Sequence, residues 1–121
     1  MAIDDKKTVI YHNPRCSKSR QSLQILNDNG VDVEVVEYLK QPPDFKTLEH
    51  ILNLLGLEPR DLMRQQEDSY TENNLSDDQL SREALIQAMV EHPKLIERPI
   101  VIRDGKAIIG RPPQRILEIL S

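Results

Sequence analysis

The first half of the chain alternates between short runs of strand-forming residues and stripes of apolar residues at helical spacing. Residues 7–12 (KTVIYH) and 31–39 (VDVEVVEYL) have the β-branched and aromatic content of strands. Between them, an amphipathic stripe ends at Gly30, a residue type that commonly terminates helices. A strand, a helix and a second strand in this order form a right-handed crossover, so the two strands should run parallel in a sheet covered by helices.

A second helix and a more polar middle section follow. Asp44 is a suitable N-cap for an apolar stripe that closes at Gly56. Beyond it we expect a short helix over residues 59–66, a loop over residues 67–78 and another helix over residues 79–91.

The last part of the chain changes period. Two apolar runs, residues 100–102 and 107–109, flank Asp104-Gly105, and this arrangement is a strong β-hairpin signal. A final helix is expected after the proline pair at 112–113. The complete order predicts an α/β protein with a thioredoxin-like (glutaredoxin-like) fold, in which a helical insertion separates an N-terminal β-α-β unit from a C-terminal β-hairpin and helix. We expect one domain over residues 1–121, a usual domain length.

Composition limits the classes of partner. With 16 Lys and Arg against 20 Asp and Glu, the net charge of −4 does not favour nucleic-acid binding, and one Phe with no Trp leaves little to stack on bases. The apolar runs are far shorter than a membrane span, and the start of the chain has no leader pattern. A single cysteine cannot form an intramolecular disulfide and fits a reducing compartment. We therefore expect a cytoplasmic protein with no nucleic-acid or membrane partner.

The lone cysteine, Cys16, lies where the first strand should give way to the first helix. An ordinary thiol has a pKa of about 8.5, but the N–H groups and dipole of a helix N-terminus favour the thiolate, as do nearby cations. Three cations lie close in sequence: Arg15, Lys18 and Arg20. Free cysteines are often buried and inert, yet burial among such charged and polar neighbours would be costly. The pattern therefore favours a reactive thiol.

The other polar residues of this loop leave their roles open. Ser17 or Ser19 is expected either to cap the helix or to donate a hydrogen bond to the sulfur or to a bound oxyanion. His12 either tunes the thiol or holds the loop by a hydrogen bond, or it merely ends the strand. His50 and His92 have the character of helix-surface residues, and no cluster of side chains has metal-ligand spacing, so we expect no metal.

The run HNPRCSKSR, residues 12–20, resembles the active-site loop of the glutaredoxin-coupled arsenate reductases, whose pattern is HNP-x-C-x-x-S-R. Four further motifs match in the same order: EYLKQPP (37–43), LMRQQ (62–66), ERPIVI (97–102) and GRPP (110–113). Because these motifs cover nearly the whole chain, it is identified as a short chromosomal-type member of the ArsC/Spx superfamily. The thioredoxin-like fold of that family, with its helical insertion, agrees with the predicted element order.

The resemblance implies a role for each matching residue. Cys16 becomes the nucleophile, and Arg64, Arg98 and Arg111 become a trio that binds the oxyanion and holds the thiolate. Guanidinium groups suit this task because they bind tetrahedral oxyanions bidentately and stay charged. Pro99 corresponds to the thioredoxin-fold proline that is usually cis. Supporting places in the active-site loop fall to four residues: His12, Asn13, Ser17 and Ser19.

The resemblance also implies the chemistry. The Cys16 thiolate would attack arsenate to give a covalent thioarsenate. Because the chain has no second cysteine, with Ser19 standing where thioredoxins carry theirs, an outside thiol must resolve this adduct. The family implies glutathione as the co-substrate, glutaredoxin as the next partner, no tightly bound cofactor and release of arsenite. We expect a monomer.

Two features depart from the plasmid-type reductases: Arg15 and Lys18 replace small residues, and the chain stops soon after its last helix. The added charge either aids anion capture or alters the partner. Two alternatives stay open, a glutathione-dependent thiol-disulfide oxidoreductase of the same fold and a non-enzymatic regulator that binds RNA polymerase, like the Spx branch. That branch typically carries CxxC where this chain has CxxS, and the arginine trio favours an enzyme.

Overall fold

The structure is a computed structural model that describes residues 7–120. The chain divides into two compact units: unit 1 comprises Met1–Gln41 and Arg98–Ser121, and unit 2 comprises Pro42–Glu97. The expected absence of a leader rests partly on residues 1–6, which lie outside the described residues. The expectation of one domain over 1–121 likewise extends beyond them and stays a prediction.

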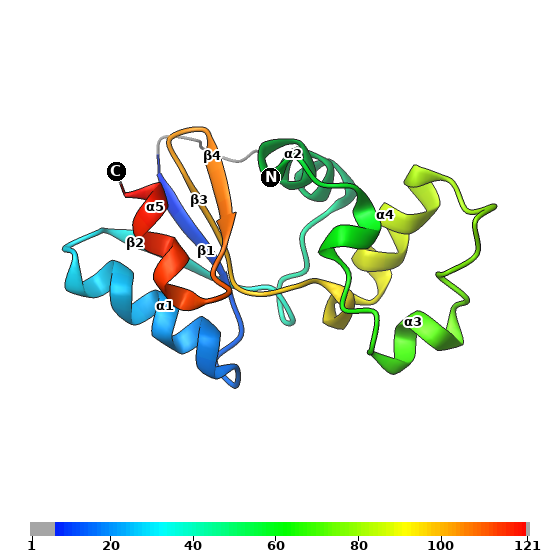
Figure 1. The fold of residues 1–121 in the computed structure, drawn as a ribbon, viewed down its shortest axis with the longest axis horizontal. Helices are drawn as coiled ribbons and strands as arrows, with labels where there is room; N and C mark the ends of the chain where they lie inside the picture. Colours follow the sequence, from blue (N-terminus) through cyan, green and yellow to red (C-terminus); the bar gives the residue numbers. More distant parts are fainter. Residues whose placement is uncertain (1–6, 121) are drawn as a thin grey trace. The chain divides into compact units, whose positions relative to one another are not determined.

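Unit 1 is built on a four-stranded sheet with the strand order β2-β1-β3-β4 (Figure 1). Its strands are β1 (Thr8–His12), β2 (Val33–Glu37), β3 (Ile100–Arg103) and β4 (Lys106–Ile109). The strand β1 pairs parallel with β2 and antiparallel with β3, which pairs antiparallel with β4. The predicted parallel crossover and the predicted hairpin are both confirmed, and β1 lies inside the sheet because it pairs with β2 on one side and with β3 on the other.

The hairpin turn has the backbone that its sequence requires. Asp104 and Gly105 have φ angles of 51° and 73°. Two successive positive φ angles are the mark of a type I′ turn, which favours Asp-Gly because glycine has no Cβ and Asp tolerates the left-handed region. The turn thus sets the register that pairs Arg103 with Lys106.

The helices of unit 1 pack an aliphatic core against the sheet. The helix α1 (Ser17–Asp28) is terminated by Gly30, which follows the C-cap residue Asn29 and has a φ of 70°. The Val31 N–H donates back to the Leu26 carbonyl at 3.0 Å. The short turn η3 (Pro113–Arg115) leads directly into α5 (Ile116–Ile119). The core cluster brings together residues of β1, α1, β3, β4 and α5: Ile10, Leu26, Val101, Ile108, Ile116 and Ile119.

The second strand is shorter than predicted. The structure has Val33–Glu37 where the pattern predicted 31–39. Since β2 lies at the edge of the sheet, its outer side has no neighbouring strand, and Val35 stays 43% exposed. The alternating valines therefore predicted the strand correctly but did not predict which of its side chains are buried.

Unit 2 consists of helices and 3-10 turns. Its elements are α2 (Phe45–Leu55), η1 (Pro59–Leu62), α3 (Asp68–Glu72), α4 (Arg82–Glu91) and η2 (Pro93–Leu95). Asp44 caps α2 as predicted, because its Oδ1 accepts a hydrogen bond from the Thr47 N–H at 2.8 Å.

Two expectations for unit 2 need correction. The segment 67–78 is not wholly a loop, since α3 forms there and buries Tyr70. The helix α4 begins at Arg82 rather than at residue 79, because the Ser81 hydroxyl accepts a hydrogen bond from the Ala84 N–H and so fixes the helix start. Over residues 7–120, no helix is both long enough and apolar enough to cross a membrane.

Candidate active site

The loop between β1 and α1 carries Cys16 to the start of the helix. The Cys16 N–H donates to the Asn13 carbonyl at 3.0 Å, and the Asn13 side-chain oxygen accepts from the Arg15 N–H at the same distance. Cys16 itself occupies the N-cap position, with extended backbone angles. The prediction that Ser17 or Ser19 caps the helix is therefore wrong, because Cys16, which precedes both serines, occupies the N-cap position.

Ser19 instead joins a buried network beneath the loop. Its hydroxyl lies 2.6 Å from His12 Nδ1 and accepts a hydrogen bond from the Asn13 N–H at 3.0 Å. Both His12 and Ser19 are buried. Burial lowers the pKa of His12 from its ordinary value; Glu37 opposes this shift, and Arg20 adds to it. Of the roles left open for His12, the structure supports holding the loop by a hydrogen bond.

The Cys16 thiol is buried, and the groups around it lower its pKa. Burial raises the pKa of the thiol, but hydrogen bonding by the Ser19 N–H, the hydrogen bond and charge of Arg98, and the Lys18 N–H outweigh it, so the pKa lies below its ordinary value. These two N–H groups do not make an ordinary side-chain cap, yet they face the sulfur closely enough to favour its anion. Only 9% of Cys16 is exposed.

Two Arg-Pro dipeptides bring cations to this sulfur. Arg98-Pro99 and Arg111-Pro112 both have cis peptide bonds, the first as predicted and the second not foreseen. The Arg111 Nε donates to the Arg98 carbonyl at 2.8 Å, and its terminal nitrogen lies 3.9 Å from Cys16 Sγ. The distance between Arg111 and the sulfur is long for a hydrogen bond. The arginine that lowers the pKa of the thiol is Arg98. The structure thus places Arg98 and Arg111 together at Cys16.

Gly110 lets these loops approach α1 closely, and its importance was missed from sequence. A Cβ at this position would overlap the hydroxyl of Ser22 and lie 2.9 Å from Pro99 Cγ and 3.2 Å from Ile116 Cδ1. The Gly110 N–H also donates to the Pro99 carbonyl at 3.0 Å. A glycine directly before an Arg-Pro pair was the available signal, but its neighbour Ser22 belongs to a distant part of the sequence.

Arg64, the third member of the predicted trio, lies in unit 2. Its guanidinium forms an ion pair with Glu67, and its Nε lies 4.0 Å from a carboxylate oxygen of Glu97. Its backbone N–H donates to the Leu95 carbonyl at 2.6 Å. These contacts hold Arg64 within unit 2, and its part in oxyanion binding stays a prediction.

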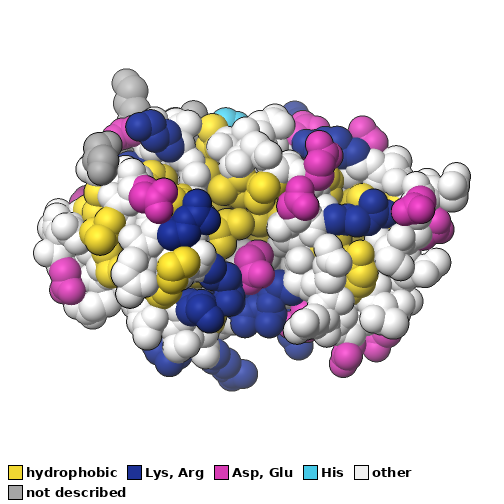
Figure 2. Space-filling view, in the orientation of Figure 1, with side chains coloured by type: hydrophobic (Ala, Val, Ile, Leu, Met, Phe, Trp, Pro, Cys, Tyr) yellow, Lys and Arg dark blue, Asp and Glu magenta, His cyan; other side chains and the backbone are white. Residues whose placement is uncertain are grey.

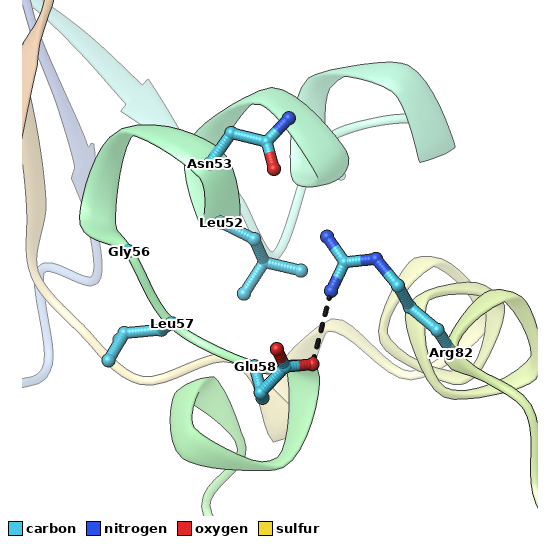
Figure 3. Close-up of a pocket in the computed structure, with 6 residues that line it drawn as sticks. All are labelled: Leu52, Asn53, Gly56, Leu57, Glu58 and Arg82. Carbon is cyan, nitrogen blue, oxygen red and sulfur yellow. Dashed lines mark hydrogen bonds and ion pairs between the residues drawn. The ribbon is translucent and has the colours of Figure 1, made fainter.

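Unit 2 also contains an open hollow of about 400 Å³ (Figure 3). It is lined by Leu52, Asn53, Gly56, Leu57, Glu58 and Arg82. Glu58 and Arg82 form an ion pair of 3.5 Å beside it, and none of its lining residues was predicted for the site. Among the described residues, no group of three or more His, Cys, Asp or Glu side chains is arranged to hold a metal ion.

Comparisons with known proteins identify a matching family and several similar proteins. The model of the ArsC family matches residues 11–119. A protein of Escherichia coli strain K12, described as uncharacterized protein YfgD, is 60% identical over 96% of this chain and 98% of its own length. A Neisseria meningitidis protein named arsenate reductase is 48% identical over 92% of this chain and 96% of its own length. The structure named arsenate reductase from Vibrio cholerae has a TM-score of 0.91 and 50% identity, over 96% of this chain and 99% of that one.

Proposed function

We propose, from the premise that this chain belongs to the ArsC family, that it is an arsenate reductase whose nucleophile is Cys16. The observation that carries the proposal is the thiol of unit 1. It is recessed, its pKa is lowered, and Arg98 and Arg111 both reach it. A cation pair beside a thiolate suits the binding of a tetrahedral oxyanion, because the same charges favour both anions. Relatives that carry the name arsenate reductase support this choice of oxyanion.

The first step is a condensation. Arsenate binds with its oxygens toward the guanidinium groups of Arg98 and Arg111. The Cys16 thiolate attacks arsenic, an S–As bond forms, and one arsenate oxygen leaves as water after taking up protons. Arsenic remains As(V) in this thioarsenate, so no electrons have yet been transferred. The arginines assist because they stabilise the negative charge that is shared among the oxygens during the displacement.

The second step transfers the electrons. A thiol outside the chain, for which we propose glutathione, attacks Cys16 Sγ and forms an S–S bond. The S–As bond breaks and its electron pair stays on arsenic, which becomes As(III) and leaves as arsenite with the proton of the incoming thiol. Glutaredoxin then takes the glutathione from the mixed disulfide and restores the Cys16 thiolate. An outside thiol is required because Cys16 is the chain's single cysteine.

This chemistry bears on the cofactor, the compartment and the oligomeric state of the protein. The electron pair comes from thiols, so no tightly bound cofactor is needed. Abundant reduced glutathione implies a reducing compartment, and we propose the cytoplasm, with the protein acting as a monomer.

A coupled assay tests the proposal. Purified protein is mixed with arsenate, glutathione, glutaredoxin, glutathione reductase and NADPH, and the oxidation of NADPH is followed. The proposal predicts turnover that depends on arsenate and is absent for Cys16→Ser. Reduction of disulfides without any dependence on arsenate would instead support a thiol-disulfide oxidoreductase. Replacing glutathione, glutaredoxin and glutathione reductase by thioredoxin and thioredoxin reductase in the same assay tests the proposed electron donor.

A further inference from the structure

Two exposed cations lie next to the recessed Cys16 in the sequence. Arg15 and Lys18 each lie within two residues of Cys16, and both are exposed. Within residues 7–120, neither side chain takes part in an ion pair. Arg20 differs, because its guanidinium donates to the Pro14 carbonyl at 2.8 Å and thereby holds the loop. Arg15 and Lys18 are thus the cations of this loop that remain available to a ligand.

The groups that chiefly lower the pKa of Cys16 are other ones. The groups that lower the pKa of its thiol are the Ser19 N–H, Arg98 and the Lys18 backbone N–H, and the side chains of Arg15 and Lys18 are not among them. The chain carries a net charge of −4, so exposed cations beside the thiol run against its overall sign. Figure 2 shows Lys and Arg side chains gathered over the end of unit 1 where α1 begins. Such local charge attracts anions to this part of the surface.

We propose that Arg15 and Lys18 bind the carboxylates of the resolving thiol, and that its class is a low-molecular-weight thiol carrying carboxylates, of which glutathione is the example. This inference rests on the proposed function. Cys16 is only 9% exposed, so a small thiol can reach its sulfur where a protein thiol meets more obstruction. Arg98 and Arg111, which contact the sulfur, hold the arsenic oxygens of the adduct, while the exposed pair receives the second reactant.

The bonding in the step is that of the proposed function. The sulfur of the bound thiol forms an S–S bond with Cys16 Sγ, the S–As bond breaks with its electron pair left on arsenic, and the thiol proton passes to arsenite. Arg15 and Lys18 take no part in this exchange of bonds. They orient the reactant and raise its local concentration, so their contribution should appear in KM for the thiol.

The decisive comparison uses two forms of one thiol. Glutathione and its diethyl ester share the reacting sulfur, but the ester lacks the carboxylates. In arsenate-dependent turnover, Arg15→Gln and Lys18→Gln should each raise KM for glutathione about twofold to fivefold, as expected for exposed charge pairs. The double variant should lose the preference for glutathione over the ester, and KM for arsenate should stay unchanged. Lys106→Gln, which removes an exposed cation of β4, is the matched control and should change neither constant.

A second measurement separates this inference from the proposed function. Oxidised glutathione and the uncharged disulfide of 2-mercaptoethanol should each form a mixed disulfide with the Cys16 thiolate in the absence of arsenate, with release of one thiol. The double variant should slow the reaction with oxidised glutathione and leave the reaction with the uncharged disulfide unaltered, even if no turnover with arsenate is found. An unchanged preference in both assays overturns the inference. A rise in KM for arsenate alone, or for glutaredoxin alone, also overturns it, because the cations would then serve the oxyanion or a protein partner.

Discussion

Arg98 and Arg111 of unit 1 differ from Arg64 of unit 2 in the groups that they contact. In unit 1, Arg111 contacts the sulfur of Cys16 and the carbonyl of Arg98, and Arg98 lowers the pKa of that thiol. In unit 2, Arg64 is paired with the carboxylates of Glu67 and Glu97. A guanidinium beside a carboxylate is already neutralised, whereas one beside a thiol shifts an ionisation equilibrium. Residue type alone therefore does not identify an active-site arginine, because its partner decides what its charge can do.

Removing the thiol should have the largest effect. Cys16→Ser replaces the only sulfur nucleophile that the chain has, and a hydroxyl is not ionised near neutral pH. We expect arsenate-dependent turnover to fall by roughly a thousandfold or more. Initial rates in the coupled assay measure this, with circular dichroism as the control for folding. Substantial residual turnover would mean that another group forms the covalent adduct.

Arg111 should contribute the next largest effect, on oxyanion binding. Losing one charge-assisted hydrogen bond costs about 1.5–3 kcal/mol, so Arg111→Ala should weaken arsenate binding roughly tenfold to a hundredfold. Arg111→Lys keeps the charge without the two-pronged geometry and should fall between the alanine variant and the wild type. The readout is the protection that arsenate gives Cys16 against alkylation. Equal protection in all three proteins would remove Arg111 from the anion site.

Gly110→Ala tests whether the arginine loops must pack closely on α1. The new methyl group would overlap the Ser22 hydroxyl and approach Pro99, so we expect a loss of about 1–3 kcal/mol in the free energy of unfolding. Ser22→Ala should not fully rescue it, since the Pro99 contact remains.

Gly30→Ala supplies the control for that substitution. Its Cβ would meet nothing within 4 Å, but its φ of 70° imposes a backbone cost of about 1 kcal/mol. Urea unfolding and the rate of Cys16 alkylation should therefore separate the two variants: both lose stability, and only Gly110→Ala changes the reactivity of the thiol. Equal thiol reactivity in the two would show that loop packing does not position the arginines.

Arg64→Ala should have the smallest effect on the isolated protein. Its half-buried ion pair contributes about 0.2–1 kcal/mol to folding, and Arg64 is not among the groups that lower the pKa of Cys16. We therefore expect the free thiol of Cys16 to be alkylated at an unchanged rate. A marked change in the alkylation rate of Cys16 would show that Arg64, like Arg98, acts on the thiol.

The sequence predicted those elements of the fold that depend on interactions between neighbouring residues. The Asp104-Gly105 turn and the Asp44 cap are confirmed because each depends on a few adjacent residues. The start of α1 was misjudged, since the Asn13 turn competes with the serines for the capping position. The helix α3 was missed because its polar residues suggested a loop while burial of Tyr70 stabilises the turn.

The site was predictable mainly through the motif resemblance. Spacing placed Cys16 at a helix start, but no local rule brings Arg98 or Arg111 to a sulfur more than eighty residues earlier. That proximity comes from the order of the sheet, in which β3 lies beside β1, so the loop before β3 meets the loop after β1. The packing of Gly110 on Ser22 has the same long-range origin.

The lowered pKa of Cys16 also predicts how stability depends on pH. Because the folded thiol ionises more readily than the unfolded one, the thiolate adds stability that is fully present above the unfolded pKa and is lost as the pH falls through the folded pKa. The stability advantage of the wild type over Cys16→Ser should therefore grow as the pH is raised between these two values.

Titration of the Cys16 thiolate by its ultraviolet absorbance tests the electrostatic basis of the site most directly. Wild-type protein and Arg98→Ala are compared across the pH range, with Cys16→Ser as the blank. The wild type should ionise below the pKa of an ordinary cysteine, and Arg98→Ala should ionise at a higher pH than the wild type. A wild-type thiol that titrates at or above the ordinary value, or one that Arg98→Ala leaves unmoved, would contradict the assignment of Arg98 and the reactive thiol to one site.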